Sequence, residues 1–218
     1  MKTHLSFAAR GLFLVWFFCP ALLLGQELKP LILPAPQTDG GRPLMQALKD
    51  RHSTREFSSE NLSPQVLANL LWAAFGINRP ATGKRTAPSA MNWQEIDVYV
   101  ATAEGLYVYD AGGNRLDPIL AGDVRGATGV QPFLKDAPLD LVYVADWAKT
   151  GRTSAEDRNL YTAADAGFIA QNVYLFCASE GLAVVVRGSL DRAALAKVMK
   201  LRPDQKILLA QTVGYPKK

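Results

Sequence analysis

Two short stretches of the chain decide its fold, namely Arg51-His52-Ser53-Thr54-Arg55-Glu56-Phe57 and, further along, Pro88-Ser89-Ala90-Met91-Asn92-Trp93-Gln94. The first places two guanidinium groups around a small hydroxyl, an arrangement that suits a phosphate and an electron-rich ring. The second combines a proline-stiffened turn, small side chains that let a flat ligand approach the backbone, and amides that both donate and accept hydrogen bonds. Together the two stretches predict a binding site for a flat, phosphate-bearing ligand.

Residues 1–25 have the layout of a secretory signal peptide. A basic start is followed by an almost continuous apolar run from Gly11 to Leu24, and the chain turns polar at Gln26. Such a run falls within the ~7–15 residues of a signal segment and short of the ~20 that span a bilayer. We expect cleavage after Gly25 and export, so that the protein is periplasmic or secreted. An uncleaved segment that anchors the protein in a membrane is the alternative.

The remaining residues suit one domain whose composition excludes several chemistries. Removing 25 of the 218 residues leaves 193, enough for a full core, and the formal charge of +4 falls by two without Lys2 and Arg10. The sequence contains no basic run interleaved with aromatic residues, the pattern that would indicate a nucleic-acid-binding protein. Cys177 is then the remaining cysteine and is predicted to be a buried thiol. With only His4 and His52 and no clustered cysteines, neither a catalytic zinc nor a serine–histidine–aspartate triad has its residues.

The hydrophobic pattern predicts a mixed α+β domain over residues 43–218, preceded by an extended, proline-rich arm at residues 26–42. Ser63-Pro64 is a strong helix start, an N-cap followed by proline at the first helical position. We expect helices at 43–51, 63–76, 154–181 and 191–200, and strands at 96–100, 106–109, 139–145, 182–186 and 207–213. Along the longest helix, small or flat positions predict close packing in the core or at a dimer interface; they are Ala163, Gly167, Ala170, Val173, Tyr174 and Ala178.

The segment Pro88-Ser89-Ala90-x-Asn92-x-Gln94 resembles a motif of the nitroreductase family. Further matches to that family follow in order: Gly167-x-x-Ala170-Gln171-Asn172, then Gly188-Ser189 after a strand, then Gly214-Tyr215-Pro216. The resemblance covers nearly all of residues 43–216. It implies a nitroreductase-like fold, in which helices flank a mixed, mostly antiparallel sheet and a long central helix lies at a dimer interface.

The same resemblance implies a homodimer that binds FMN. Arg51 and Ser53 would hold the flavin phosphate and ribityl chain, with His52 contributing through its backbone, and Arg55 would lie beside the pyrimidine edge of the ring. Four residues would reach the same flavin from the other subunit, namely Pro88, Ser89, Ala90 and Asn92. Gly188 and Ser189 would offer N–H groups near N5 and O4, and Lys217 or Arg85 would support the phosphate, because the chain stops at Lys218 before the family's terminal basic pair.

The implied activity is that of an FMN-dependent oxidoreductase, which passes a hydride from a donor such as NAD(P)H through FMN to a small organic acceptor. Residues 116–136 are too few for the two-helix lid of the larger relatives, so the chain looks more like the compact, azoline-oxidase-like branch. A non-catalytic, exported FMN-binding or scavenging dimer is the alternative. No metal is expected in either case.

Overall fold

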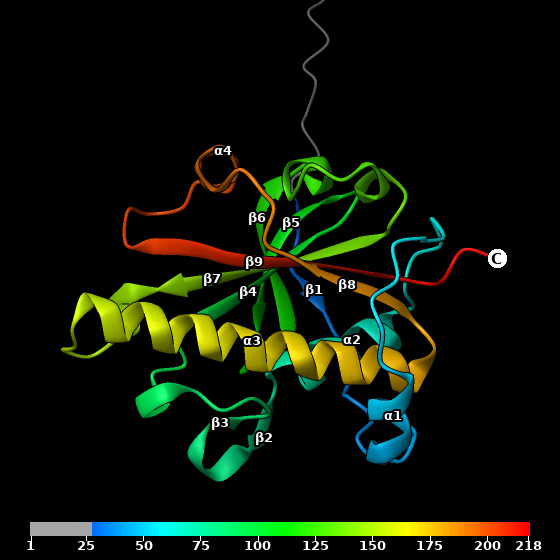
Figure 1. Cartoon of the computed structure of the whole chain (residues 1–218), viewed down its shortest axis with the longest axis horizontal. Coiled ribbons are helices and arrows are strands. Elements are labelled where there is room, and N and C mark those ends of the chain that lie inside the picture. Colours follow the sequence, from blue (N-terminus) through cyan, green and yellow to red (C-terminus); the bar gives the residue numbers. More distant parts are fainter. Residues whose placement is uncertain (1–27) are drawn as a thin grey trace, which may run out of the picture.

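A seven-stranded sheet crossed by one long helix forms the centre of the molecule in the computed structural model, which describes residues 28–218 (Figure 1). The signal peptide predicted at residues 1–25 therefore lies outside the described residues. The helices are α1 (Leu44–Asp50), α2 (Pro64–Phe75), α3 (Ala155–Glu180) and α4 (Arg192–Val198). The strands are β1 (Leu31–Ile32), β2 (Ile77–Arg79), β3 (Lys84–Arg85), β4 (Ile96–Ala101), β5 (Gly105–Asp110), β6 (Arg115–Ala121), β7 (Leu139–Asp146), β8 (Ala183–Arg187) and β9 (Gln205–Gly214).

The large sheet has the order β1-β6-β5-β4-β7-β9-β8, and each of these pairings is antiparallel. Strand β7 is buried at every position, as expected for a strand covered on both faces. Strands β2 and β3 form a separate hairpin. The expected mostly antiparallel sheet with flanking helices is confirmed.

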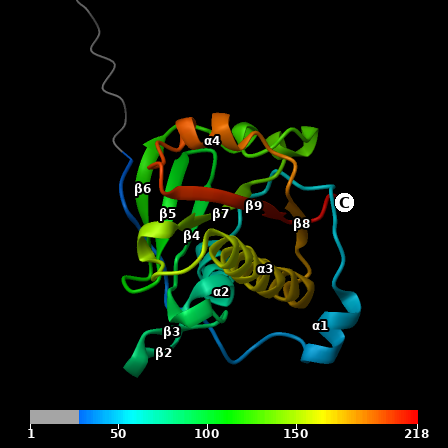
Figure 2. The same cartoon turned by 60° about the vertical axis from the view of Figure 1, so that its left-hand side comes forward.

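Two layers of side chains cover the sheet. Helices α2 and α3 lie on one face and α4 lies on the other (Figures 1 and 2). The larger core joins α2 and α3 to the sheet through residues such as Leu70, Leu141 and Ile169. The smaller core lies under α4 around Leu195 and Ile207. The sheet is thus held from both sides, which fixes the ends of β8 and α3 where the site residues lie.

The predicted helix starts are confirmed by their caps. The hydroxyl of Ser154 accepts a hydrogen bond from the N–H of Asp157 at 2.9 Å, and Ser63 and Asp191 cap α2 and α4 in the same way. Helix α3 ends at Gly181, whose φ of 71° is a left-handed conformation that glycine adopts without steric cost. The long helix therefore begins and ends within one residue of the predicted bounds.

The structure adds details that the sequence did not predict. Strands β2 and β3 form a hairpin between α2 and the 88–94 segment, where no strand is predicted, and the extended arm contributes strand β1 to the edge of the sheet. The small-residue face of α3 is divided: Ala163 and Gly167 point outward, whereas Ala170, Val173 and Tyr174 are buried. The reason is that the sheet and α2 cover only one side of this helix.

Among residues 28–218, no helix combines the length and the apolar character needed to cross a bilayer. The same residues contain no cluster of three or more histidine, cysteine or acidic side chains that could hold a metal ion. Cys177 is fully buried, and burial raises the pKa of its thiol well above the usual range. This thiol is thus a core residue rather than a nucleophile.

Candidate flavin site

The segment that carries Arg51, Ser53 and Arg55 runs beside the edge strand β8. The N–H of Thr54 donates to the carbonyl of Val184 at 2.9 Å. The hydroxyl of Tyr174, on α3, accepts from the N–H of Val186 at 2.9 Å and lies 2.8 Å from the hydroxyl of Ser53. Tyr174 therefore connects the segment, the long helix and the strand at one point.

The charged groups of this segment are held differently. The guanidinium of Arg51 lies over the Tyr174 ring, 5.3 Å from its centre, a cation–π contact that leaves its N–H groups for a ligand. The ring nitrogen Nδ1 of His52 lies 2.7 Å from the carbonyl of Asp50, so this side chain is tied to its own backbone. Arg55 is exposed and has no ion pair among the described residues. Two guanidinium groups of this segment thus lack a carboxylate partner.

The C-terminus returns to the same segment but only in part to the same site. The N–H of Lys217 donates to the carbonyl of Glu56 at 3.3 Å, and Phe57 pairs with Pro216. Lys217 is one of the residues that line an open cavity of about 740 Å³, to which neither Arg51 nor Ser53 contributes. The structure therefore brings the backbone of Lys217 close to the segment, and the role of its ammonium group in binding a phosphate stays a prediction.

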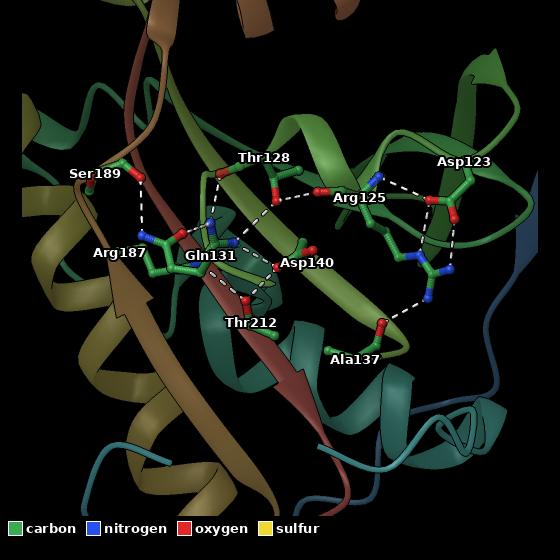
Figure 3. A network of polar contacts seen from close by, with 9 residues as sticks. All are labelled: Asp123, Arg125, Thr128, Gln131, Ala137, Asp140, Arg187, Ser189 and Thr212. Atoms are coloured by element: carbon green, nitrogen blue, oxygen red, sulfur yellow. Dashed lines mark hydrogen bonds and ion pairs between the residues drawn. The ribbon is translucent and has the colours of Figure 1, made fainter. Parts of the chain in front are cut away.

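The turn Gly188-Ser189 follows β8 and is exposed, and its two backbone N–H groups have no acceptor among the described residues. Figure 3 shows the buried polar network that holds this turn. The guanidinium of Arg187 donates to Asp140 and to the carbonyl of Thr128, both at 2.7 Å. The amide of Gln131 donates to the carbonyl of Ser189 at 3.4 Å. The turn is thus held by the network through the carbonyl of Ser189, and its two N–H groups are not used in it.

The Arg187–Asp140 pair is almost completely buried, and burial acts on both charges. It raises the pKa of Asp140 to about 6, against the lowering effect of Arg187 and Thr212, and it lowers the pKa of Arg187. Because the carboxyl pKa stays below 7 and both groups are hydrogen-bonded, the pair remains ionised at neutral pH. The oxygen Oδ2 of Asp140 has no hydrogen-bond partner, so the buried carboxylate depends closely on the charge of Arg187.

The second predicted segment forms a loop over the N-terminal half of α3. The N–H of Ala90 donates to Asp165 at 2.8 Å, and the N–H of Gln94 donates to the hydroxyl of Ser89 at 2.8 Å. Met91, Asn92 and Gln94 all have φ values between 50° and 55°, a left-handed conformation that costs most L-residues about 1–2 kcal/mol. The hydrogen bonds to Ser89 and Ala90 hold the loop in this conformation.

A pair of buried carboxyl groups lies beneath this loop. Glu95 is fully buried and Asp165 is 2% exposed. The hydroxyl of Ser89 donates to Oε2 of Glu95 at 3.1 Å, whereas Oε1 has no partner. Burial first and the charge of Asp165 next raise the pKa of Glu95 to about 7, and burial also raises the pKa of Asp165. The two groups therefore hold at least one proton at mildly acidic pH.

The two segments do not meet within one chain. Tyr174, which holds Ser53, and Asp165, which holds Ala90, are nine residues apart on α3. At a rise of about 1.5 Å per residue they lie roughly 13 Å apart along the helix. Along α3, the structure thus places Arg51 and Ser53 at Tyr174 and the 88–94 loop at Asp165.

Sequence reasoning missed the residues that position the site. Tyr174 was assigned only to the packing face of α3, and Glu95, Asp165, Arg187 and Asp140 were given no role. The available signal was a charged residue next to an apolar run, as in Glu95 before β4 and Asp140 within β7. A buried charge of this kind requires a partner, and its position therefore predicts one.

Comparison with known proteins shows the family and the fold of the chain. The sequence profile described as the nitroreductase family matches residues 48–215. The chain is 45% identical to a nitroreductase-like protein of Ralstonia eutropha JMP134, whose crystal structure superposes with a TM-score of 0.85 over 89% of this chain and 93% of that one. A curated nitroreductase-like protein of Methanocaldococcus jannaschii is 28% identical over 76% of this chain and 88% of its own length.

A solved structure of lower identity to this chain contains FMN. A nitroreductase-like protein of Desulfovibrio desulfuricans, crystallised in complex with FMN, has a TM-score of 0.60 at 20% identity, over 82% of this chain and 89% of that one. At this identity the likeness concerns the fold alone. The fold and the matched segments define a flavin-dependent oxidoreductase, and the chain belongs to the nitroreductase family. Its place in the azoline-oxidase-like branch stays a prediction.

Proposed function

We propose that this protein is an FMN-dependent oxidoreductase that takes a hydride from a donor such as NAD(P)H and passes it to a small organic acceptor. The observation that carries the proposal is that the Arg51–Arg55 segment pairs with β8 through Thr54 and contacts it through Tyr174 at Val186, two residues before the Gly188-Ser189 turn. Carboxylate-free guanidinium groups suit a phosphate and an electron-rich ring edge, and the free N–H groups of the turn suit the acceptor atoms of a ring. These residues therefore fit FMN.

Each residue would have a distinct task once FMN is bound, with the flavin itself supplying the hydride chemistry. Arg51 and Ser53 would bind the phosphate and the ribityl chain, Ser53 being oriented by Tyr174. Arg55 would favour the ring in its reduced, more negative form. A unit charge at ~4 Å is worth roughly 1 kcal/mol in water and roughly 4 kcal/mol at a partly buried site. The Gly188-Ser189 turn would orient the ring through its N–H groups.

We also propose that the active unit is a homodimer in which the 88–94 loop of one subunit completes the site of the other. The described chain exposes an apolar surface that supports this arrangement. It includes Met45 on α1 at 75% exposure, Leu160 and Phe168 on α3 at 62% and 47%, and Met91 in the loop at 80%. Exposed apolar residues gathered on neighbouring elements are typical of a protein–protein interface. A two-fold pairing through α3 would also bring the two separated segments together.

The experiment begins with the purified protein. We expect heat to release a ligand with the mass of FMN, light scattering to give a dimer with one FMN per chain, and the yellow colour to bleach with NADH or NADPH. Recovery of FAD, or a monomer that retains one FMN, would contradict the site as described. A coloured dimer that no donor reduces would favour a flavin-binding protein without activity.

Two further variants address the role of Arg55. Arg55→Ala should retain the dimer but lower the flavin reduction potential, and Arg55→Lys should recover much of the loss because it keeps the charge. Export is a separate proposal, supported by the composition of residues 1–25. N-terminal sequencing of the protein from its native cell should give a chain that begins at Gln26, and an intact Met1 on membrane-bound material would indicate an anchor instead.

A further inference from the structure

A small cavity with three cationic side chains lies beside the 88–94 loop. It measures about 220 Å³, is partly open, and is lined by residues of the β2–β3 hairpin and of the loop. Arg79, Lys84 and Arg85 line it together with the amides of Asn92 and Gln94, and no acidic residue does. A cavity lined in this way is electropositive, and nothing in its wall neutralises it.

The two arginines are fixed in position by uncharged partners. The Nε of Arg85 donates to the amide oxygen of Gln94 at 2.8 Å, its Nη1 donates to the carbonyl of Phe75 at 3.1 Å, and its charge lies 5.1 Å from the centre of the Phe75 ring. The Nη2 of Arg79 donates to the carbonyl of Arg85 at 2.8 Å. Each guanidinium is therefore preorganised and still has N–H groups to offer.

None of the three cations forms an ion pair with residues 28–218. Burial lowers the pKa of Arg85, against weaker opposing effects of Tyr109, Asp110 and Asp97. A partly desolvated guanidinium without a carboxylate in contact is a costly arrangement that a bound anion would relieve.

The cavity also has a defined relation to the proposed flavin site. Pro88, Ser89 and Asn92 line it, and these residues are the ones expected to approach the ring. Its volume is smaller than the ~300–1,000 Å³ of a pocket for a whole drug-sized ligand, so it suits one charged group of a molecule that extends toward the flavin.

We propose that this pocket binds the anionic group, a carboxylate or a phosphate, of the small molecule that exchanges electrons with the flavin. The inference rests on the proposed function, and it names the substrate class: an anionic rather than a neutral organic molecule. Lys84 and Arg79 act as specificity-determining residues through their charge, and Arg85 also shapes the loop through Gln94.

The test uses the full-length, FMN-loaded protein and three probes of similar size, namely benzoate, phenyl phosphate and neutral benzamide. Calorimetric titration should show that at least one anion binds more tightly than benzamide. Lys84→Gln and Arg79→Gln should each raise the Kd of that anion about fivefold and leave benzamide unchanged, which is roughly the effect of one partly screened charge. Lys197→Gln, on α4 at the far face of the sheet, is the matched control and should change neither value.

The outcomes separate the possibilities. Preference for phenyl phosphate assigns the pocket to a phosphate-bearing ligand, and preference for benzoate assigns it to a carboxylate. Equal binding of all three probes, or variants without effect, overturns the inference. The inference is also overturned if the Lys84 variant loses affinity for FMN but not for riboflavin, because the pocket would then bind the flavin phosphate. Protein that holds no FMN contradicts the proposed function instead, whereas protein that is reduced normally but shows no anion preference contradicts only this inference.

Discussion

Replacing Glu95 by glutamine should remove a pH dependence from the stability of this protein. Glutamine keeps the shape of the side chain and can accept from Ser89 and donate to Asp165, but it cannot ionise. The folded-state pKa of Glu95 is raised from 4.5 to about 7, so its stabilising contribution is complete below pH 4.5 and is lost as the pH rises through 7. After an allowance for partial solvent screening, the loss amounts to about 2–3 kcal/mol.

Urea unfolding of the flavin-free protein between pH 5 and pH 8.5 measures this difference. At pH 5 the free energies of unfolding of wild type and Glu95→Gln should agree within about 1 kcal/mol. At pH 8.5 the variant should be the more stable by up to about 2 kcal/mol, because only the wild type then carries the buried charge. Asp140 also has a raised pKa and contributes the same pH dependence to both proteins. Glu60→Gln, at an exposed position, is the control. A variant that is destabilised equally at both pH values would refute the reasoning.

Three further substitutions address the other parts of the site. Tyr174→Phe leaves the N–H of Val186 without its partner and should cost about 1–3 kcal/mol in urea unfolding, more than Ser53→Ala, which removes only the Ser53 hydroxyl from its contact with Tyr174; the opposite order would contradict the connecting role of Tyr174. Arg187→Met leaves Asp140 buried and unpaired and should cost about 3–5 kcal/mol, most of which a second change of Asp140 to leucine should restore. Gly167→Leu adds a side chain where no atom lies within 4 Å in the single chain, so thermal stability of the subunit should hold while light scattering shows fewer dimers; an unchanged dimer places the interface elsewhere.

The sequence predicted the elements whose signals are local. The cap of α2, the bounds of α3 and the apolar runs of β4, β7 and β9 were predicted because capping and periodicity depend on neighbouring residues. Strand β6 was missed because it carries Arg115, Asp117 and Pro118, which are unfavourable for a strand. A register shift in its pairing with β5, next to the Tyr107–Pro118 pair, accommodates the proline, and only the tertiary pairing reveals this.

The same distinction between local signals and tertiary contacts applies to the candidate site. The motif segments 51–57 and 88–94 were recognisable because ligand contacts require particular residue types in a particular order. The residues that support these segments could not be recognised from the sequence, because the burial of Glu95 or Asp140 depends on the sheet and on α3. The charge of Lys217 and its place near the end of the chain predict a phosphate contact, and this role stays a prediction.

The covering of strand β8 by the Ser53 segment and Tyr174 has a consequence for the behaviour of the protein in solution. An edge strand with free N–H and carbonyl groups is a template for pairing with other chains and so for aggregation. Here the N–H of Thr54 donates to the carbonyl of Val184, and the hydroxyl of Tyr174 accepts from the N–H of Val186. The opposite edge of the sheet is a strand of only two residues. The residues that would bind the cofactor therefore also block pairing of other chains with this edge of the sheet. A mutation that loosens them would lower the yield of soluble protein as well as disrupt the proposed site.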